Sequence, residues 1–145
     1  LSAISKISNG DFRRSINILQ NLKYYSKNKI IKKNVYSMTS YIDEEEIKYY
    51  WNFSKDIKSI KLINNEIINL LNKGFPVNYI LNGFNILISI STDLNEKQKS
   101  LLYIFLSNVE RRILNGSSYK IQILSLFIYL NSIYNYDEDY ISKTF

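Results

Sequence analysis

Apolar residues recur along much of the chain every three or four positions, and this period is typical of an amphipathic α-helix. Seven stripes with this spacing can be traced, and polar residues or glycines separate them. They cover residues 1–7, 12–22, 47–51, 60–71, 80–87, 102–113 and 121–130. A shorter stripe, formed by Val35 and Met38, lies between the second and the third. The pattern predicts an all-α fold with about seven helices.

The second predicted helix begins directly after an acidic residue. Asp11 can accept hydrogen bonds from the N–H groups of a first helical turn, so it is predicted to be the N-cap. The helical spacing predicts that Phe12, Ile16, Leu19 and Leu22 lie on one apolar face of this helix.

One stretch is compatible with two kinds of secondary structure. Ile86, Ile88 and Ile90 alternate with other residues, as in a β-strand, and Gly83 lies in the middle of the stretch. A glycine inside a helix costs about 1 kcal/mol relative to alanine. The helical spacing over residues 80–87 favours a helix, and the strand remains the alternative.

The charge of the chain is unevenly distributed. Lysine and arginine number 19 against 13 acidic residues, a net charge of +6. Residues 1–42 hold eight basic residues and one acid, a net charge of +7, whereas residues 43–145 hold eleven basic and twelve acidic residues. This asymmetry predicts two domains, 1–42 and 43–145, with different partners. The first could bind phosphate groups, although a solvated loop over residues 27–33 is the favoured interpretation of its lysines.

Two residue types are absent. The sequence has no cysteine and no histidine, which excludes disulfides, thiolate zinc sites, cysteine nucleophiles and Ser-His-Asp triads. The acids at 43–46 could bind a divalent metal, but they point in different directions around a helix, so a first helical turn is favoured. We therefore predict no catalytic residue and no metal site.

No membrane or secretion signal is recognised. The most apolar stretch, residues 121–130, is too short to cross a bilayer, so no membrane partner is expected. The chain begins at Leu1 without a signal-peptide pattern and is interpreted as a fragment of a longer protein.

Aromatic residues cluster after the acidic stretch. Tyr49, Tyr50, Trp51 and Phe53 could stack on single-stranded bases, or could form a core or subunit interface. The nearly neutral charge beyond residue 43 favours the core or interface. The many apolar residues in the last two predicted helices also suggest burial against partner subunits.

The most informative local sequence covers residues 10–20 and reads G-D-x-R-R-x-x-N-x-L-Q. Gly10 permits a sharp turn, Asp11 fixes the start of the helix, and Arg13 projects from the first turn, where N–H groups and the helix dipole favour an anion. The planar guanidinium of arginine suits phosphate oxygens. The segment is thus a candidate anion site, with a solvated helix surface as the alternative.

This motif resembles the second-sensor helix in the lid of AAA+ clamp loaders, specifically the small subunits of replication factor C. The order of the later segments is also similar to that family. Residues 35–36 and 43–47 resemble the junction between lid and collar, and residues 96–100 and 106–123 resemble the last two collar helices. Two positions depart from the pattern, because Ser40 stands for a usual glycine and Asp43 for a nearby proline. Ser117, Ser118 and Tyr119 also replace positions that are often acidic.

The resemblance implies a role for each part of the chain. Arg13 would contact the γ-phosphate of ATP, with Gly10 and Asp11 positioning it. Residues 1–42 would be the end of the lid, and residues 43–145 would be a collar that packs against sister subunits in a pentamer. That pentamer loads a sliding clamp onto primer–template DNA in the nucleus.

The catalytic parts of the family do not occur in this sequence. It has no G-x-x-x-x-G-K-[ST] phosphate loop, no metal-binding acidic motif and no Ser-Arg-Cys finger. This fragment is therefore not expected to hydrolyse ATP by itself or to hold a cofactor, since phosphoryl transfer needs the lysine and magnesium ligands of the full-length protein.

Two alternatives to this assignment remain. The first is a free-standing helical module that binds nucleic acid or a protein partner through the basic N-terminal segment. The second is a related AAA+ assembly, such as an alternative or bacterial-type clamp loader.

Overall fold

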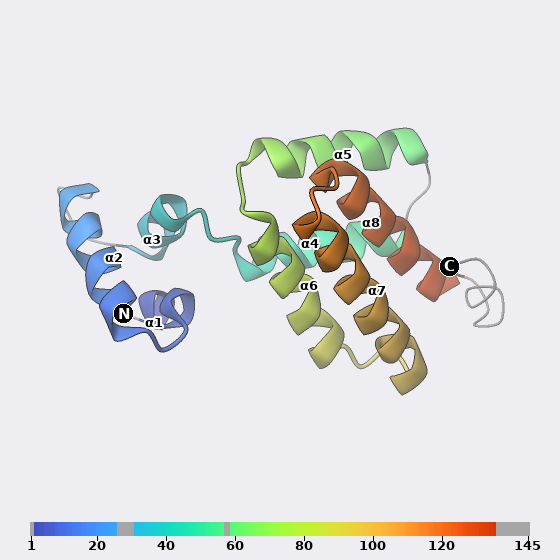
Figure 1. The fold of residues 1–145 in the computed structure, drawn as a ribbon, viewed down its shortest axis with the longest axis horizontal. Helices are drawn as coiled ribbons and strands as arrows, with labels where there is room; N and C mark the ends of the chain where they lie inside the picture. The colour runs from blue at the N-terminus through green and yellow to red at the C-terminus, as the bar shows by residue number, and fades with distance from the viewer. Residues whose placement is uncertain (1, 26–30, 57–58, 136–145) are drawn as a thin grey trace. The chain divides into compact units, whose positions relative to one another are not determined.

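The computed structural model describes residues 2–25, 31–56 and 59–135. These residues form eight α-helices and no strand, which confirms the all-α fold class (Figure 1). The additional helix is α3 (Lys32–Thr39), a short element that contains Val35 and Met38. The chain divides into two compact units, Leu1–Asp43 and Glu44–Phe145.

The first unit is a cluster of three helices. Helices α1 (Ser2–Ser8) and α2 (Phe12–Tyr25) pack against each other, and both contact α3. Its core contains Ala3, Ile4, Ile7, Ile18, Leu22 and Val35. The predicted loop over residues 27–33 falls partly on residues 26–30, which lie outside the described residues, but its last two lysines begin α3.

The predicted apolar face of α2 is mostly exposed. Phe12, Ile16 and Leu19 are 77%, 40% and 38% exposed, whereas Ile18 and Leu22 are buried. Helix α2 carries two apolar stripes that share Leu22, and α1 and α3 cover only the stripe that contains Ile18. Periodicity detects an apolar stripe but does not tell which of two stripes a neighbour will cover.

The second unit is a bundle of five helices. These are α4 (Glu44–Lys55), α5 (Ile60–Asn72), α6 (Val77–Ile90), α7 (Glu96–Leu114) and α8 (Tyr119–Asn135). Helix α8 packs on α4, α5 and α7, and α6 packs on α4 and α7 (Figure 1).

The apolar residues of α8 are used inside this unit. Because three helices surround α8, its side chains are buried around most of its circumference, including Leu126, Phe127 and Leu130. They therefore do not provide the surface for partners that the sequence suggested. Helix α7 differs, since Leu102 is fully buried but Ile104 is 61% exposed.

Aromatic rings fill the centre of the second unit. Tyr50 and Trp51 are buried, and the Trp51 ring lies 5.9 Å from that of Phe84. Phe84 in turn lies 5.6 Å from Phe127, which is 6.4 Å from Tyr50. The core interpretation of the aromatic cluster is thus confirmed for these two residues, while Tyr49 remains half exposed.

Residues 77–90 are helical, so the strand alternative is wrong. The reason for the glycine in the helix is now visible. A Cβ atom at Gly83 would lie 2.6 Å from Cγ1 of Ile47 on α4. Glycine therefore allows α4 and α6 to approach closely, at the cost of helix propensity.

None of the described helices is long and apolar enough to span a membrane. Glu44, Glu45 and Glu46 form the first turn of α4, as predicted, where their charges complement the helix dipole.

Candidate functional site

A tight turn leads into the segment that the sequence singled out. Between α1 and α2, Asn9 has a φ of 50° and Gly10 a φ of 85°. Glycine adopts such positive values without the steric cost that other residues incur. The N–H of Asp11 donates to the carbonyl of Ser8 at 3.0 Å and closes the turn. The turn therefore fixes where α2 begins.

Asp11 caps α2, as the sequence predicts. Its Oδ1 accepts a hydrogen bond from the backbone N–H of Arg14 at 3.0 Å. The hydroxyl of Ser15 donates to the backbone carbonyl of Asp11, also at 3.0 Å. The carboxylate thus occupies part of the N-terminal end of the helix, so an external anion would depend mainly on a side chain for its binding.

Arg13 is the side chain in position to do this. It lies in the first turn of α2, is exposed, and makes no hydrogen bond or ion pair with any described residue. Asn17 and Gln20, four and seven positions further on, lie on the same face of the helix and are also exposed. The structure thus presents an uncommitted guanidinium beside polar groups.

Other cations of the first unit are also exposed, but at least one is engaged. Lys6, Lys23 and Lys33 are on the surface. Lys32 lies 3.5 Å from the carboxylate of Asp43 and over the ring of Tyr36, at 5.1 Å from its centroid. Tyr36 and Asp43 raise the pKa of Lys32.

In the second unit, one polar cluster connects α4 with the C-terminal end of α5. Lys73 forms an ion pair with Glu46, and its Nζ donates to the hydroxyl of Tyr50 at 3.2 Å. The hydrogen bond that Lys73 donates to the Glu46 carboxylate is the main cause of the raised pKa of Lys73. Burial raises the pKa of Tyr50.

A second polar cluster connects α4 with α8 and the segment that follows α6. Lys55 pairs with Asp93 at 2.5 Å, and the Tyr134 hydroxyl donates to the same carboxylate oxygen at 2.9 Å. The ammonium of Lys55 also lies over the rings of Tyr134 and Trp51. The hydrogen bond from Lys55 is the main factor that lowers the pKa of Asp93, and burial is the main factor that raises that of Tyr134.

A capping box at the start of α7 also connects this helix with α8. The side chain of Asn95 accepts from the N–H of Gln98 at 2.8 Å, and the Gln98 side chain accepts from the N–H of Asn95 at 3.1 Å. Gln98 also donates to the carbonyl of Ile133 in α8 at 3.1 Å. The capping box was detectable in the sequence as an asparagine followed three positions later by glutamine, but the contact with α8 was not.

Among the described residues, these polar groups do not form a metal-binding cluster. Within the described ranges, no three Asp or Glu side chains come together as they would around a metal ion. The second unit does expose single large apolar side chains on several helices, namely Leu62, Ile86, Ile90, Ile104, Leu114 and Ile121.

The chain is thus an all-helical protein with an arginine-bearing helix in one unit and a five-helix bundle in the other. Residues 42–129, which cover most of that bundle, match the family described as the replication factor C C-terminal domain. The chain belongs to this family.

Curated relatives are similar over most of the chain. Replication factor C subunit 4 of Arabidopsis thaliana is 25% identical over 127 residues, which are 87% of this chain and 37% of that protein. Replication factor C subunit 2 of Oryza sativa subsp. japonica is 26% identical over 126 residues, with the same two shares. A putative replication factor C small subunit of Acanthamoeba polyphaga mimivirus is 30% identical, over 92% of this chain and 45% of that protein. The chain therefore spans less than half of the length of these relatives.

Proposed function

We propose that this chain is the C-terminal part of a clamp-loader subunit that acts in the nucleus. In this proposal the second unit is the collar, which joins the subunit to its sister subunits. The assembled complex uses ATP to load a sliding clamp onto primer–template DNA. The observation that carries the proposal is the family match over residues 42–129, because it coincides with the five-helix bundle.

The first unit is proposed to be the end of the lid. Its arginine, Arg13, would contact the γ-phosphate of ATP, with Gly10 and Asp11 setting the start of its helix. Three features support this role. The guanidinium makes no bond with a described residue, the helix start is fixed by a turn and a cap, and arginine binds phosphate oxygens through two parallel hydrogen bonds.

The rest of the ATP site is proposed to lie elsewhere in the full-length protein. One guanidinium fits a contact with a phosphate, but no carboxylate cluster in the described residues fits Mg²⁺. ATP and Mg²⁺ are therefore proposed as cofactors of the full-length protein, and the described part would supply only the sensing contact.

The test of this assignment uses the full-length subunit within its complete complex. Arg13→Ala is expected to reduce ATP-dependent clamp loading at least tenfold, since a charged hydrogen bond contributes about 1.5–3 kcal/mol. Assembly of the complex, measured by size-exclusion chromatography, is expected to be unchanged because Arg13 lies outside the five-helix bundle. Lys23→Ala, which removes an exposed cation near the other end of α2, is the matched control and is expected to leave clamp loading unchanged.

Two outcomes would contradict the assignment. Unchanged clamp loading by Arg13→Ala would show that Arg13 does not sense ATP. A full-length subunit without residues 44–145 that still joined the complex would show that the five-helix bundle is not the collar.

A further inference from the structure

Asparagine is followed by glycine at three places in the chain, Asn9-Gly10, Asn82-Gly83 and Asn115-Gly116. Such a pair can undergo deamidation without an enzyme or a cofactor. The backbone nitrogen of the glycine attacks Cγ of the asparagine side chain, and glycine favours this attack because it has no Cβ atom to obstruct it. The three pairs have the same chemistry, so the local structure decides how fast each of them reacts.

The attack has two structural requirements. The nucleophile is the deprotonated backbone nitrogen, so a hydrogen bond donated by the glycine N–H opposes the reaction. The backbone must also rotate at the asparagine to bring its Cγ to this nitrogen, so a peptide group that is held on both sides reacts slowly. Each pair can therefore be judged by the hydrogen bonds of its glycine.

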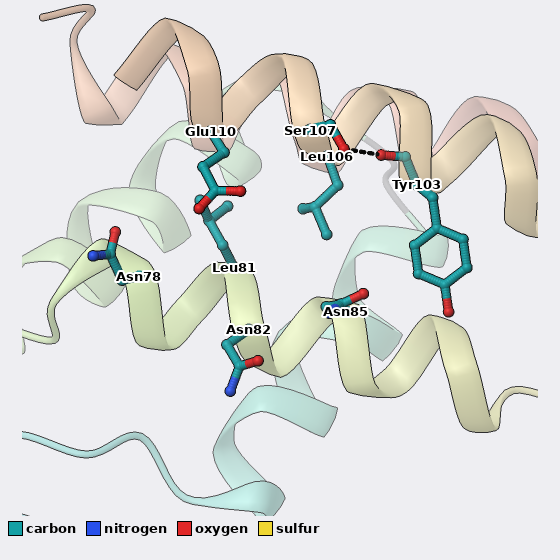
Figure 2. Close-up of a pocket in the computed structure, with 8 residues that line it drawn as sticks. All are labelled: Asn78, Leu81, Asn82, Asn85, Tyr103, Leu106, Ser107 and Glu110. Atoms are coloured by element: carbon teal, nitrogen blue, oxygen red, sulfur yellow. Dashed lines mark hydrogen bonds between the residues drawn. The ribbon is translucent and has the colours of Figure 1, made fainter. Parts of the chain in front are cut away.

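Asn82-Gly83 lies in the middle of α6. The Asn82 side chain is exposed, and Figure 2 shows its carboxamide pointing away from α7. The backbone, however, is helical, so the N–H of Gly83 donates to the carbonyl four residues before it. Gly83 also lies directly against Ile47 of α4, so α6 cannot open here without a loss of packing. This pair is protected by its backbone.

Asn115-Gly116 ends α7 and is also exposed. Its glycine has a φ of 88°, and its N–H donates to the carbonyl of Ile113 at 3.0 Å. The N–H of Ser117 donates to the carbonyl of Arg112, also at 3.0 Å. Both peptide groups of the glycine are thus hydrogen-bonded, as is common where a helix ends at a glycine. This pair is partly protected.

Asn9-Gly10 meets both requirements. Its two residues are exposed and form the centre of the turn that the hydrogen bond from Asp11 to Ser8 closes. The N–H of Gly10 donates to no described residue, so the nucleophile is accessible. Asn9 has a φ of 50°, a left-handed conformation that is unfavourable for residues other than glycine, and rotation out of it relieves this cost.

We propose that Asn9 is a modification site, which deamidates in the folded chain faster than Asn82 and Asn115. A bond forms between the Gly10 nitrogen and Cγ of Asn9, the bond from Cγ to Nδ2 breaks, and Nδ2 leaves as ammonia with the proton of the Gly10 N–H. Water then opens the resulting succinimide ring. Opening at Cγ gives aspartate, whereas opening at the backbone carbonyl gives isoaspartate.

Both products change the entry to α2. Each adds a negative charge beside the turn, and isoaspartate also adds one carbon to the main chain between Ser8 and Asp11. The hydrogen bond between these two residues would then have to close a longer loop, so the start of α2 would be fixed less well. The inference rests on the geometry of the turn and is independent of the function proposed for Arg13 and for the collar.

The test uses the complete 145-residue chain, because trypsin releases each pair in a peptide of its own, 7–13, 74–97 or 113–120. The folded chain is incubated at mildly alkaline pH, and the conversion of amide to acid is followed by liquid chromatography and mass spectrometry. Isoaspartate appears as a second peptide with the mass of the aspartate form. Fragment spectra locate the change in 74–97, which contains four asparagines.

The rates are expected to follow the hydrogen bonds. Asn9 is expected to react about two- to tenfold faster than Asn115, since the N–H of Gly116 must first lose one hydrogen bond. It is expected to react at least about a hundredfold faster than Asn82, since α6 must open around a packed contact. In urea, where the fold no longer distinguishes the pairs, the three rates are expected to become similar.

Two variants confirm the site. Asn9→Gln is expected to abolish the change in 7–13, which contains no other asparagine, and to leave the rate at Asn115 unchanged. Asn17→Gln, at an exposed position of α2, is the matched control and is expected to leave the rate at Asn9 unchanged.

Three results would overturn the proposal. The first is that Asn115 or Asn82 reacts as fast as Asn9 in the folded chain, or that Asn9 reacts only in urea. The second is that the ratios of the three rates are the same in the folded chain and in urea, which would show that the fold does not control the reaction. The third is that the change in 7–13 persists in Asn9→Gln.

Discussion

The close approach of α4 and α6 predicts that alanine at position 83 destabilises the second unit. On propensity alone, Gly83→Ala would stabilise α6 by about 1 kcal/mol. The added Cβ, however, would lie 2.6 Å from Cγ1 of Ile47 and 3.1 Å from its Cδ1. Carbon atoms attract each other best at about 3.5–4.0 Å, so this contact is strongly repulsive.

The size of the effect follows from how the repulsion can be relieved. Ile47 is buried and β-branched, so its side chain has few other conformations available. Either α6 moves away from α4 or Ile47 adopts a strained rotamer, and overpacking of this kind costs about 1–3 kcal/mol. After subtraction of the gain in propensity, the free energy of unfolding is expected to fall by up to about 2 kcal/mol.

The chain provides its own reporter for this measurement. Trp51 is its only tryptophan, lies one turn after Ile47 on α4, and packs 5.9 Å from the ring of Phe84. Urea unfolding followed by Trp51 fluorescence therefore reports the second unit. Ser89→Ala, at an exposed position of the same helix, is the control for alanine substitution without a steric contact.

A double-mutant cycle identifies the cause. Ile47→Ala removes the two clashing atoms at a cost of about 2–5 kcal/mol. In that background, Gly83→Ala is expected to stabilise by up to about 1 kcal/mol, because only the propensity term remains. An equal loss of stability in both backgrounds would refute the steric explanation, and so would a stabilising effect of Gly83→Ala in the unaltered chain.

Two further predictions concern backbone strain and acid stability. Ser40 has a φ of 50°, so Ser40→Gly is expected to stabilise the first unit by about 0.5–1 kcal/mol. Amide hydrogen exchange in α2 measures this change. As a control, Ser37→Gly, inside α3, is expected to destabilise the unit instead. Lys55 lowers the pKa of Asp93 below its ordinary value of 3.8. The pair therefore stabilises the fold fully at a pH above 3.8, and this stabilisation is lost as the pH falls through the lowered pKa. Asp93→Asn is therefore expected to lower the free energy of unfolding at pH 7, measured by urea unfolding. It is also expected to make this free energy depend less on pH in the acidic range. An equal change with Asp56→Asn would contradict this explanation.

The sequence predicted helices most accurately where capping and termination signals agreed with the apolar periodicity. Helical stripes were predicted over 102–113 and 121–130, and the structure has helices Glu96–Leu114 and Tyr119–Asn135 around them. Asn95 and Gly116 mark the limits of α7 through a side-chain cap and a positive φ of 88°. Such signals act within one turn, so they can be read without knowledge of the fold.

Features that depend on the packing of remote segments could not be predicted. Helix α3 has only eight residues, and its buried Val35 belongs to a core supplied mainly by α1 and α2. Gly83 was understood only once Ile47 was placed against it.

The exposed apolar stripe of α2 bears on the proposed function. The exposed stripe of Phe12, Ile16 and Leu19 lies directly beside Arg13, since Arg13 and Ile16 are neighbours at a spacing of three residues. A surface that contacts the stripe would therefore also approach the guanidinium. In the proposed sensor, a phosphate bound to Arg13 would hold the apolar stripe against the same surface, and loss of the phosphate would weaken both contacts together. This shared contact would let one charged group control the position of a whole helical unit.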